Sequence, residues 1–267
     1  MKRAREWLFH KLNKKIILSD LEFQKGCPEI IPGLSQHPYW PREKLPWIQE
    51  IENQIPIIKE ELLTLRSQKG FQPYRGPTWT SSIKSDDGIG SKSHDSGDWN
   101  VFYLTLHGMS FKENQEKCPK TMEMIKNLVP RNYDHAFFSA VVPGTHIMKH
   151  HGPTNKKLRL HIPLLSVEGS KMRVADEIKE MEAGKAYVFD DSFEHEVWHE
   201  GPATRIILIV DFWHPDLTDE EIKFFRVLMN SKLRMEKMVS ELDEKKDNFF
   251  GVIEESKSIL QDNEWWV

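Results

Sequence analysis

Cysteine, long apolar runs and excess charge are all scarce in this sequence. Its 267 residues include two cysteines, Cys27 and Cys118, which lie far apart and flank no CxxC motif or Cys/His cluster. Neither a disulfide framework nor a structural zinc site is indicated, and we expect a reducing, cytoplasmic compartment. No run of about 18 apolar residues occurs, so we expect no integral membrane segment. With 37 basic and 41 acidic residues the net charge is -4, which provides no global field to attract nucleic acid.

The chain is nevertheless long and apolar enough to bury a full core. It is 39% hydrophobic and 10% aromatic, which is typical of one large globular domain or of a domain with a helical extension. We expect residues 1–75 to form an N-terminal helical extension. Residues 1–18, MKRAREWLFHKLNKKIIL, are basic and amphipathic but lack the apolar core and cleavage site of a secretory signal. We interpret them as a solvated helix; a segment that touches a membrane or targets an organelle is the alternative.

A helix is predicted at 45–66, and a long polar loop follows it. The apolar residues of this helix recur at steps of three and four: Leu45, Ile48, Ile51, Ile55, Ile58, Leu62 and Leu65. Pro56 is a candidate kink. Residues 76–98 are rich in Gly, Ser and Asp and too long for a passive connection, so we expect a mobile or substrate-covering loop. Beyond it, 99–108 favours a strand, and 118–130 favours a helix stopped by a proline.

From Asp134 onward, short β-prone runs are separated by turn residues. They are HAFFSAVVPG, KLRLHIPLL, KMRVAD, KAYVFDD and RIILIVDFW. Evenly spaced short strands without intervening helices indicate an antiparallel sandwich or barrel. We expect the core domain to span residues 76–217, with 76–98 as its mobile loop.

The last 50 residues return to a helical pattern. Thr218 and Glu221 form a capping box, and an apolar stripe follows at Ile222, Phe225, Leu228, Met229 and Leu233. We expect residues 218–267 to form a C-terminal helix and a tail packed on the core. Trp265 and Trp266 are expected to dock on the protein's own surface; a clamp for a partner is the alternative.

Histidine is concentrated in the β-rich region. The members there are His135, His146, His150, His151, His161, His195, His199 and His214. A single buried histidine is more often a hydrogen-bonded structural residue than a ligand, so only a constellation of them can indicate chemistry.

Such a constellation is formed by His150 and His195. His150 lies at a turn just before Gly152, and His195 follows an apolar strand and an acidic turn, 45 residues later (195 minus 150). Two imidazoles from separate strands of a β-barrel can converge on a divalent transition metal. A pair with open positions suits iron(II) used for oxygen chemistry. Asp191 and Glu194 could orient a ligand imidazole or a metal-bound water.

Arg205 opens the almost purely apolar run RIILIVDFW, ten residues after His195 (205 minus 195). A buried guanidinium without compensation is costly, so it needs a carboxylate from the protein or from a ligand. Arginine binds carboxylates through two parallel hydrogen bonds. A histidine ligand followed by such an arginine is the arrangement with which iron-dependent oxygenases hold the distal carboxylate of 2-oxoglutarate.

Four stretches carry a resemblance to a known family: GDWNVFYL (97–104), CPKT (118–121), PGTHIMKHHGPTNKKLRLHIPL (143–164) and FDDSFEHEVWHEGPATRIILIVDFWHPDLT (189–218). The chain resembles the aspartyl/asparaginyl β-hydroxylases, non-haem Fe(II)- and 2-oxoglutarate-dependent dioxygenases with a double-stranded β-helix (jelly-roll, cupin-like) core. The resemblance spans 97–218 and is weaker in the first 70 residues.

The resemblance implies a role for each matching residue. His150 and His195 would bind iron; Ser139, His161 and Arg205 would bind 2-oxoglutarate; Arg159 would bind a substrate carboxylate; and Asp191 would act from behind the ligands as a catalytic residue. The partners would be dioxygen and a peptide, protein or small carboxylate substrate.

Three positions depart from the wider pattern of such oxygenases. Most use a His-X-Asp/Glu motif, but Gly152 stands at its third position. The family that the chain resembles also has glycine there, with water in place of the carboxylate. Lys157 stands where a second arginine is expected. The identity of the substrate is therefore undetermined, because a lysine ammonium cannot bind a carboxylate through the two parallel hydrogen bonds of a guanidinium. Val141 occupies a variable position beside the cofactor. His151, next to the expected ligand, is an alternative to His150.

We therefore expect an oxygenase that hydroxylates an unactivated carbon, first of all the β-carbon of an Asp or Asn side chain in a peptide or protein. A small carboxylate-bearing metabolite or a lipid is the alternative substrate. The alternative of another class is an inactive β-barrel that recognises carboxylate peptides. A cupin-like isomerase or a metal-storage protein would not explain Arg205.

Overall fold

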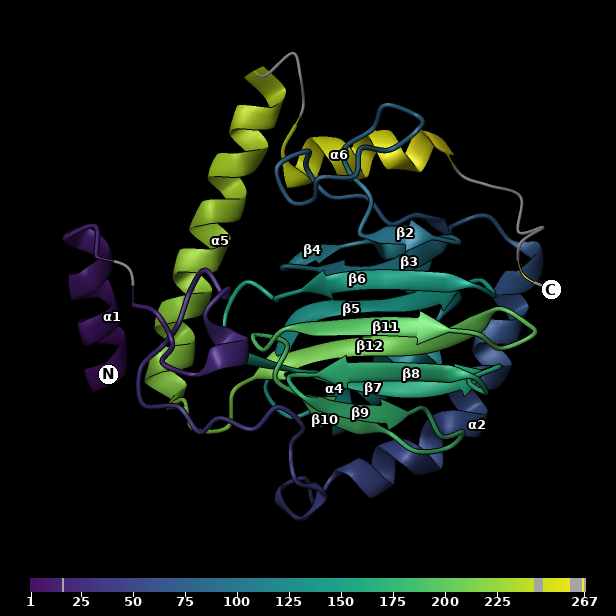
Figure 1. Cartoon of the computed structure of the whole chain (residues 1–267), viewed down its shortest axis with the longest axis horizontal. Coiled ribbons are helices and arrows are strands. Elements are labelled where there is room, and N and C mark those ends of the chain that lie inside the picture. Colours follow the sequence, from purple (N-terminus) through teal and green to yellow (C-terminus); the bar gives the residue numbers. More distant parts are fainter. Residues whose placement is uncertain (16, 243–246, 260–265, 267) are drawn as a thin grey trace.

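Two antiparallel β-sheets face each other, and helices flank them (Figure 1). The computed structural model describes residues 1–15, 17–242, 247–259 and 266. Apolar side chains from both sheets, such as Phe137 and Ile207 from the larger and Ile147 and Val197 from the smaller, form one buried cluster between them. The space between the sheets is thus the inner core of the molecule.

The larger sheet has seven strands in the order β1-β3-β5-β12-β7-β10, with β4 paired to β3. Their bounds are β1 (Gln72–Pro73), β3 (Trp99–Leu106), β4 (Met109–Ser110), β5 (Asn132–Val141), β7 (Lys157–Leu165), β10 (Tyr187–Phe189) and β12 (Arg205–Trp213). Every residue of β12 is buried. A strand covered on both faces is expected to be an almost unbroken apolar run, and RIILIVDFW is such a run.

The smaller sheet has five strands in the order β2-β6-β11-β8-β9. Their bounds are β2 (His94–Ser96), β6 (Thr145–His150), β8 (Ser170–Val174), β9 (Glu177–Glu180) and β11 (His195–His199). In β8 and β11 buried residues alternate with half-buried ones. This alternation is typical of a sheet whose inner face packs on the core while its outer face meets water.

Helices α2 (Ile48–Thr64) and α4 (Pro119–Leu128) cover the outer face of the larger sheet. All seven apolar residues expected on the helix at 45–66 are buried in this second core, and Pro56 lies inside α2. The short α3 (Lys112–Lys117) precedes α4. Single turns of 3-10 helix occur at Glu22–Gln24, Arg42–Lys44, Leu65–Ser67 and Lys257–Ile259.

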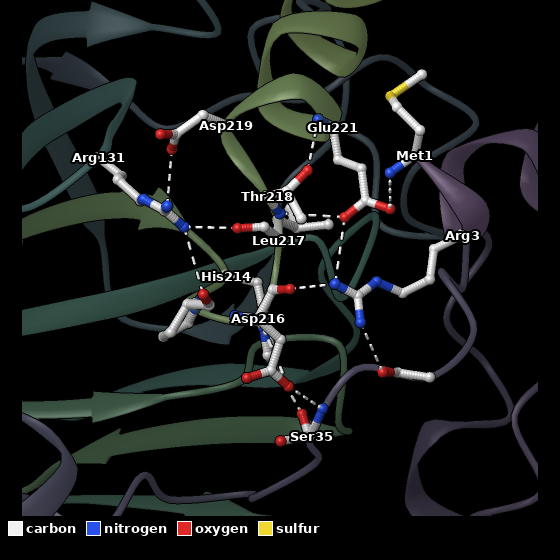
Figure 2. Close-up of polar contacts among 12 residues, drawn as sticks. Met1, Arg3, Ser35, Arg131, His214, Asp216, Leu217, Thr218, Asp219 and Glu221 are labelled. Atoms are coloured by element: carbon white, nitrogen blue, oxygen red, sulfur yellow. Dashed lines mark hydrogen bonds and ion pairs between the residues drawn. The ribbon is translucent and has the colours of Figure 1, made fainter.

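A third core joins α1 (Lys2–Leu12) to α5 (Asp219–Leu242), which stand together at one side of the sheets (Figure 1). The predicted capping box is present: the Glu221 amide donates to Thr218 Oγ1 at 3.3 Å, and the Thr218 amide donates to the Glu221 carboxylate at 3.1 Å. Figure 2 shows Arg3 of α1 reaching the same carboxylate. The last helix, α6 (Phe249–Ser256), packs near α5.

The predicted double-stranded β-helix with flanking helices is confirmed. Strands β1, β2, β4, β6, β9 and β11 were not among the runs identified from the sequence, and β2 lies inside the stretch 76–98 that was expected to be a loop. Trp266 is buried against Phe71, at 5.6 Å between ring centroids, as expected for docking on the protein itself, whereas Trp265 lies outside the described residues. The domain limits at 75/76 and 217/218 and the mobility of 76–98 remain predictions. No helix in the described part of the chain is long and apolar enough to cross a membrane.

Glu61 of α2 caps the start of α4 and should contribute measurably to stability. Its buried carboxylate accepts the amides of Lys120 and Thr121, each at 2.8 Å, and the Thr121 hydroxyl at 2.6 Å. Glu61→Ala leaves the buried amide and hydroxyl of Thr121 without their acceptor, so we expect a loss of about 1–3 kcal/mol in the free energy of unfolding. Urea denaturation followed by circular dichroism measures it. The exposed neighbour Glu60 provides the control, since Glu60→Ala should change stability by less than about 0.5 kcal/mol.

Candidate active site

His150, at the end of β6, and His195, at the start of β11, are direct partners across the smaller sheet. Their ring centroids are 4.1 Å apart. Nδ1 of His150 lies 2.8 Å from the Met148 carbonyl, and Nδ1 of His195 lies 2.8 Å from the Phe193 carbonyl. Because a carbonyl oxygen only accepts, each Nδ1 must carry the proton. Each neutral ring therefore presents the lone pair of Nε2, the atom a metal ion would bind.

Burial keeps both imidazoles neutral. It lowers the pKa of His150, and the nearby Arg159 guanidinium lowers it further. Burial also places the pKa of His195 well below its ordinary value, with the His150 ring as the next cause. Neutral imidazole is the form that coordinates a metal. We refer to His150 and His195 together as the histidine pair.

His151 does not join this pair. Its ring lies against the backbone of the N-terminal segment, so close to Gly26 that a Cβ on that glycine would come within 2.4 Å of it. The structure therefore brings His150 and His195 together, as predicted. It places the ring of His151, the alternative candidate for the metal ligand, against Gly26.

The Asp191 carboxylate lies directly against the backbone of Gly152, where a side chain at position 152 would otherwise be. A Cβ built on Gly152 would lie 2.4 Å from the carboxylate carbon of Asp191, so any side chain at position 152 would displace that carboxylate. One oxygen, Oδ1 of Asp191, is buried and has no hydrogen-bond partner in the described part of the chain. Within the described residues no group of three or more His, Cys, Asp or Glu side chains could hold a metal. The described residues thus bring two imidazoles together, and the Asp191 carboxylate fills the space that a side chain at position 152 would take.

Inward-facing residues of the larger sheet form successive rows beneath the histidine pair. Ile207 of β12 pairs with Ser139 of β5, and Ile209 pairs with His161 of β7. Asp211 pairs with Arg159. Arg205 and Asp211 lie six residues apart on the same strand (211 minus 205), which is roughly 20 Å along an extended chain. The rows therefore separate an arginine at one end from a charged cluster at the other.

Arg205 is almost completely buried, at 1% exposure. Its Nη1 lies 3.5 Å from the Met181 sulfur, its Nε has no hydrogen-bond partner, and no carboxylate in the described residues forms an ion pair with it. Burial lowers the pKa of Arg205 to about 10, so the side chain stays charged at neutral pH. A permanent cation in this setting calls for an anion that is not part of the described chain.

Ser139 and His161 lie near this arginine and carry polar contacts. The Ser139 hydroxyl accepts a hydrogen bond from Trp99 Nε1 at 2.9 Å, and Trp99 stacks on Tyr74 with centroids 3.8 Å apart. His161 Nδ1 lies 3.3 Å from the Tyr187 hydroxyl. Burial and the cations Arg159 and Arg205 hold the pKa of His161 well below its ordinary value. Ser139 and His161 therefore lie in the two rows between Arg205 and the charged cluster.

The charged cluster consists of Lys157, Arg159, Asp191 and Asp211. Lys157 Nζ contacts the Asp191 carboxylate at 2.6 Å and the Asp211 carboxylate at 2.9 Å. Arg159 donates from Nε and Nη2 to Asp211 at 2.8 and 3.0 Å, and its Nη1 lies 3.4 Å from Asp191. The two cations hold the pKa of Asp211 well below its ordinary value against burial. Two positive and two negative charges therefore balance within the protein.

Asp211 and His135 lie in this part of the site but received no role from the sequence. Asp211 is the one acidic residue within the run RIILIVDFW, and that break in an apolar strand is the signal that could have revealed it. His135 pairs with Asp211 in the β5–β12 register, is 6% exposed, and leaves Nδ1 without a hydrogen-bond partner in the described chain.

A hollow of about 1270 Å³ lies elsewhere, among α5, α6 and β4, and none of its lining residues belongs to the predicted site.

Two facing antiparallel sheets, with a pair of metal-competent imidazoles and a buried arginine between them, define the class: a double-stranded β-helix protein with a candidate metal site. The sequence model of the family described as aspartyl/asparaginyl beta-hydroxylase matches residues 52–215. The chain belongs to this family.

Two relatives identified from their sequences agree with this membership. The aspartyl/asparaginyl beta-hydroxylase of Mus musculus is 35% identical over 72% of the chain, but the chain spans only 25% of that protein's length. The ornithine lipid ester-linked acyl 2-hydroxylase of Rhizobium tropici is 33% identical over 68% of the chain and 62% of its own length. A solved oxidoreductase of the 2OG-Fe(II) oxygenase family from Burkholderia pseudomallei is 11% identical over 62% of the chain and 90% of its own, with a TM-score of 0.42.

Proposed function

We propose that this protein is an Fe(II)- and 2-oxoglutarate-dependent dioxygenase that hydroxylates an unactivated carbon. The observation that carries the proposal is Arg205, a buried cation without a carboxylate partner in the described chain, on the sheet that faces two imidazoles with free Nε2 atoms. A structural role alone would not explain a charge left uncompensated in a core. An anionic cosubstrate explains it together with the histidine pair.

The donor set fits the proposed cofactors. Nε2 of His150 and Nε2 of His195 would bind iron, and the unpartnered Asp191 oxygen would accept a hydrogen bond from water in the third position. Arg205 and the Ser139 hydroxyl would bind the distal carboxylate of 2-oxoglutarate. When bound, iron and 2-oxoglutarate together would activate dioxygen, giving succinate, carbon dioxide and one oxygen atom for the substrate carbon.

The chain's own residues would orient the substrate and exclude water. Asp211 occupies Nε and Nη2 of Arg159, and Nη1 makes only a longer contact of 3.4 Å to Asp191, so Nη1 is the atom that would turn to a substrate group. Lys157 is fully buried, and its ammonium already contacts two carboxylates. It would therefore bind a substrate carboxylate more weakly than an unpaired cation would. The inner-face apolar residues Phe137, Ile207 and Ile209 exclude bulk water, which strengthens each remaining polar contact.

The first candidate substrate is the β-carbon of an Asp or Asn side chain in a peptide or protein, as the family suggests. A small carboxylate-bearing metabolite or a lipid acyl chain is the second candidate. It is favoured by the balanced charges of Lys157, Arg159, Asp191 and Asp211, and by the lipid hydroxylase among the relatives. An inactive carboxylate-binding module is the remaining alternative.

Succinate release measured with Fe(II), 2-oxoglutarate and a panel of substrates tests the proposal. The panel pairs one peptide carrying Asp with the same peptide carrying Asn, and adds a small dicarboxylate and a micellar acyl lipid. We expect at least one of them to raise succinate release about tenfold or more above the uncoupled rate, with oxygen incorporated into the product by mass spectrometry. Binding of 2-oxoglutarate without turnover on any substrate would instead favour the inactive module.

A further inference from the structure

Helix α1 has a buried side that fixes it to the body of the protein. Ala4 and Trp7 are buried, and the Trp7 ring meets the Phe225 ring of α5 edge-on at 5.4 Å. Arg3 adds polar contacts to the same neighbourhood, with Nη1 donating to the Gly33 carbonyl at 3.3 Å and Nη2 to the Glu221 carboxylate at 3.2 Å (Figure 2). The orientation of α1 is therefore set by the fold.

The opposite side of α1 is a stripe of exposed cationic and apolar residues. Lys2, Arg5, Phe9 and Leu12 follow one another at steps of three, four and three, so they lie on one face of the helix. All four are exposed, with Phe9 at 60% and Leu12 at 75%. We call these four residues the α1 stripe. A face turned to water would ordinarily carry polar residues, and two large apolar side chains beside two cations need another explanation.

Further cations extend the α1 stripe beyond the helix. Lys14 and Lys15 are exposed just after its end, and Lys11 lies beside them around a small hollow that Ile17 also lines. Leu18 and Leu21 follow at 64% and 42% exposure. The described N-terminal residues therefore combine an excess of positive charge with protruding apolar groups, although the acidic Glu6, Asp20 and Glu22 are exposed there as well.

The charge and shape of this surface indicate its occupant. A second copy of the chain docking through the same stripe would place cations against cations, which is unfavourable. A peptide helix usually docks in a groove, whereas the α1 stripe protrudes from a helix at the edge of the molecule (Figure 1). Exposed apolar side chains flanked by Lys and Arg match the interface of an anionic lipid bilayer, where apolar groups enter the acyl boundary and cations meet phosphates.

A chain of contacts leads from Lys11, on the Trp7 side of α1, to the edge of the candidate active site. Lys11 lies 3.7 Å from Glu29, and Glu29 pairs with Lys156 at 2.6 Å, one residue before β7 begins. The segment between α1 and Glu29 includes Phe23, whose carbonyl accepts the Glu194 amide beside His195. A surface bound by α1 would thus lie next to the segment that borders the histidine pair.

We propose that the α1 stripe docks this protein on membranes rich in anionic phospholipids. The docking requires only the folded N-terminal surface, so it can hold or fail independently of the hydroxylase proposal. Its affinity depends on two contributions, insertion of Phe9 and Leu12 and attraction of the surrounding cations. Only the second contribution is screened by salt.

Flotation of the full chain with lipid vesicles tests the docking. We expect binding to vesicles with about one third phosphatidylglycerol to be at least about tenfold stronger than to pure phosphatidylcholine, and to weaken as salt is raised. The double variant Lys2→Glu/Arg5→Glu should lose the preference for anionic vesicles. The double variant Phe9→Ser/Leu12→Ser should lower affinity about tenfold or more at every salt concentration.

A matched control is available on α5, where Val239 and Leu242 are 55% and 86% exposed. Val239→Ser/Leu242→Ser should bind vesicles like the unmodified chain. Equal losses in this control, or no binding by the unmodified chain, would overturn the proposal. Binding to polyglutamate but not to vesicles would assign the surface to an acidic protein and overturn it as well. Succinate release with a soluble substrate should be the same in all variants, which separates docking from catalysis.

Discussion

Replacing Arg205 by Met should make the ligand-free protein more stable and at the same time remove its response to 2-oxoglutarate. Arg205 is a buried cation, and the fall of its pKa to about 10 corresponds to a penalty of about 3 kcal/mol for the charged form. Because this pKa is depressed on folding, the penalty is present at every pH below about 10. Methionine fills a similar volume without charge, so we expect the free energy of unfolding to rise by about 1–4 kcal/mol.

The ligand response is the second half of the expected result. At a concentration of 2-oxoglutarate a hundred times its Kd, binding should stabilise the unmodified chain by about 2.7 kcal/mol. In Arg205→Met the distal carboxylate would have no cation to bind, so the stabilisation should disappear. Differential scanning calorimetry of both proteins, with and without the ligand in the presence of Mn²⁺, measures each half separately.

Arg131 provides the matched control, because its guanidinium is satisfied. It donates to the Leu217 carbonyl at 2.6 Å and pairs with Asp219 at 2.7 Å at the surface (Figure 2). Arg131→Met should leave the ligand response unchanged and lower the stability by about 1 kcal/mol. A destabilised Arg205→Met that still responds to 2-oxoglutarate would show that this arginine has a structural role and would remove the main support for the cosubstrate.

Strands that are buried on both faces could be predicted from the sequence. Strands with one face exposed to solvent were harder to predict. The run RIILIVDFW becomes β12, whose apolar character persists along its length because helices and the opposite sheet cover it. In β9, EIKE, all four residues are exposed, and in β11, HEVWH, buried residues alternate with half-buried ones. Four or five residues of such alternation carry too little hydrophobic signal to be distinguished from a loop.

The candidate site could be proposed from the sequence to the extent that its residues follow one another along the chain. The spacing of His150, His195 and Arg205 indicated a metal and a carboxylate ligand before any geometry was known. The engagement of Arg159 and Lys157 by Asp211 could not be predicted, because it depends on the register between β7 and β12. A shift of one residue in that register would turn Asp211 away from the inner face.

His150→Ala and His195→Ala should each abolish hydroxylation. Each variant removes one of the two imidazoles proposed to bind the metal, and within the described residues no group of three or more His, Cys, Asp or Glu side chains could replace it. With one imidazole left, iron should not be retained, and we expect substrate-dependent succinate release to fall by at least about 10³-fold. Iron content after gel filtration, measured by inductively coupled plasma mass spectrometry, should fall in parallel.

His151→Ala separates this result from a general effect of losing a histidine at the site. His151 is adjacent to His150 in sequence, but its ring packs against Gly26 and does not face His195. We therefore expect His151→Ala to retain iron and most of the turnover. Circular dichroism should show that all three variants are folded, since removing one neutral imidazole is expected to cost only about 1–2 kcal/mol. Turnover that persists in both ligand variants, or that is lost equally in His151→Ala, would contradict the assignment of the histidine pair as the metal site.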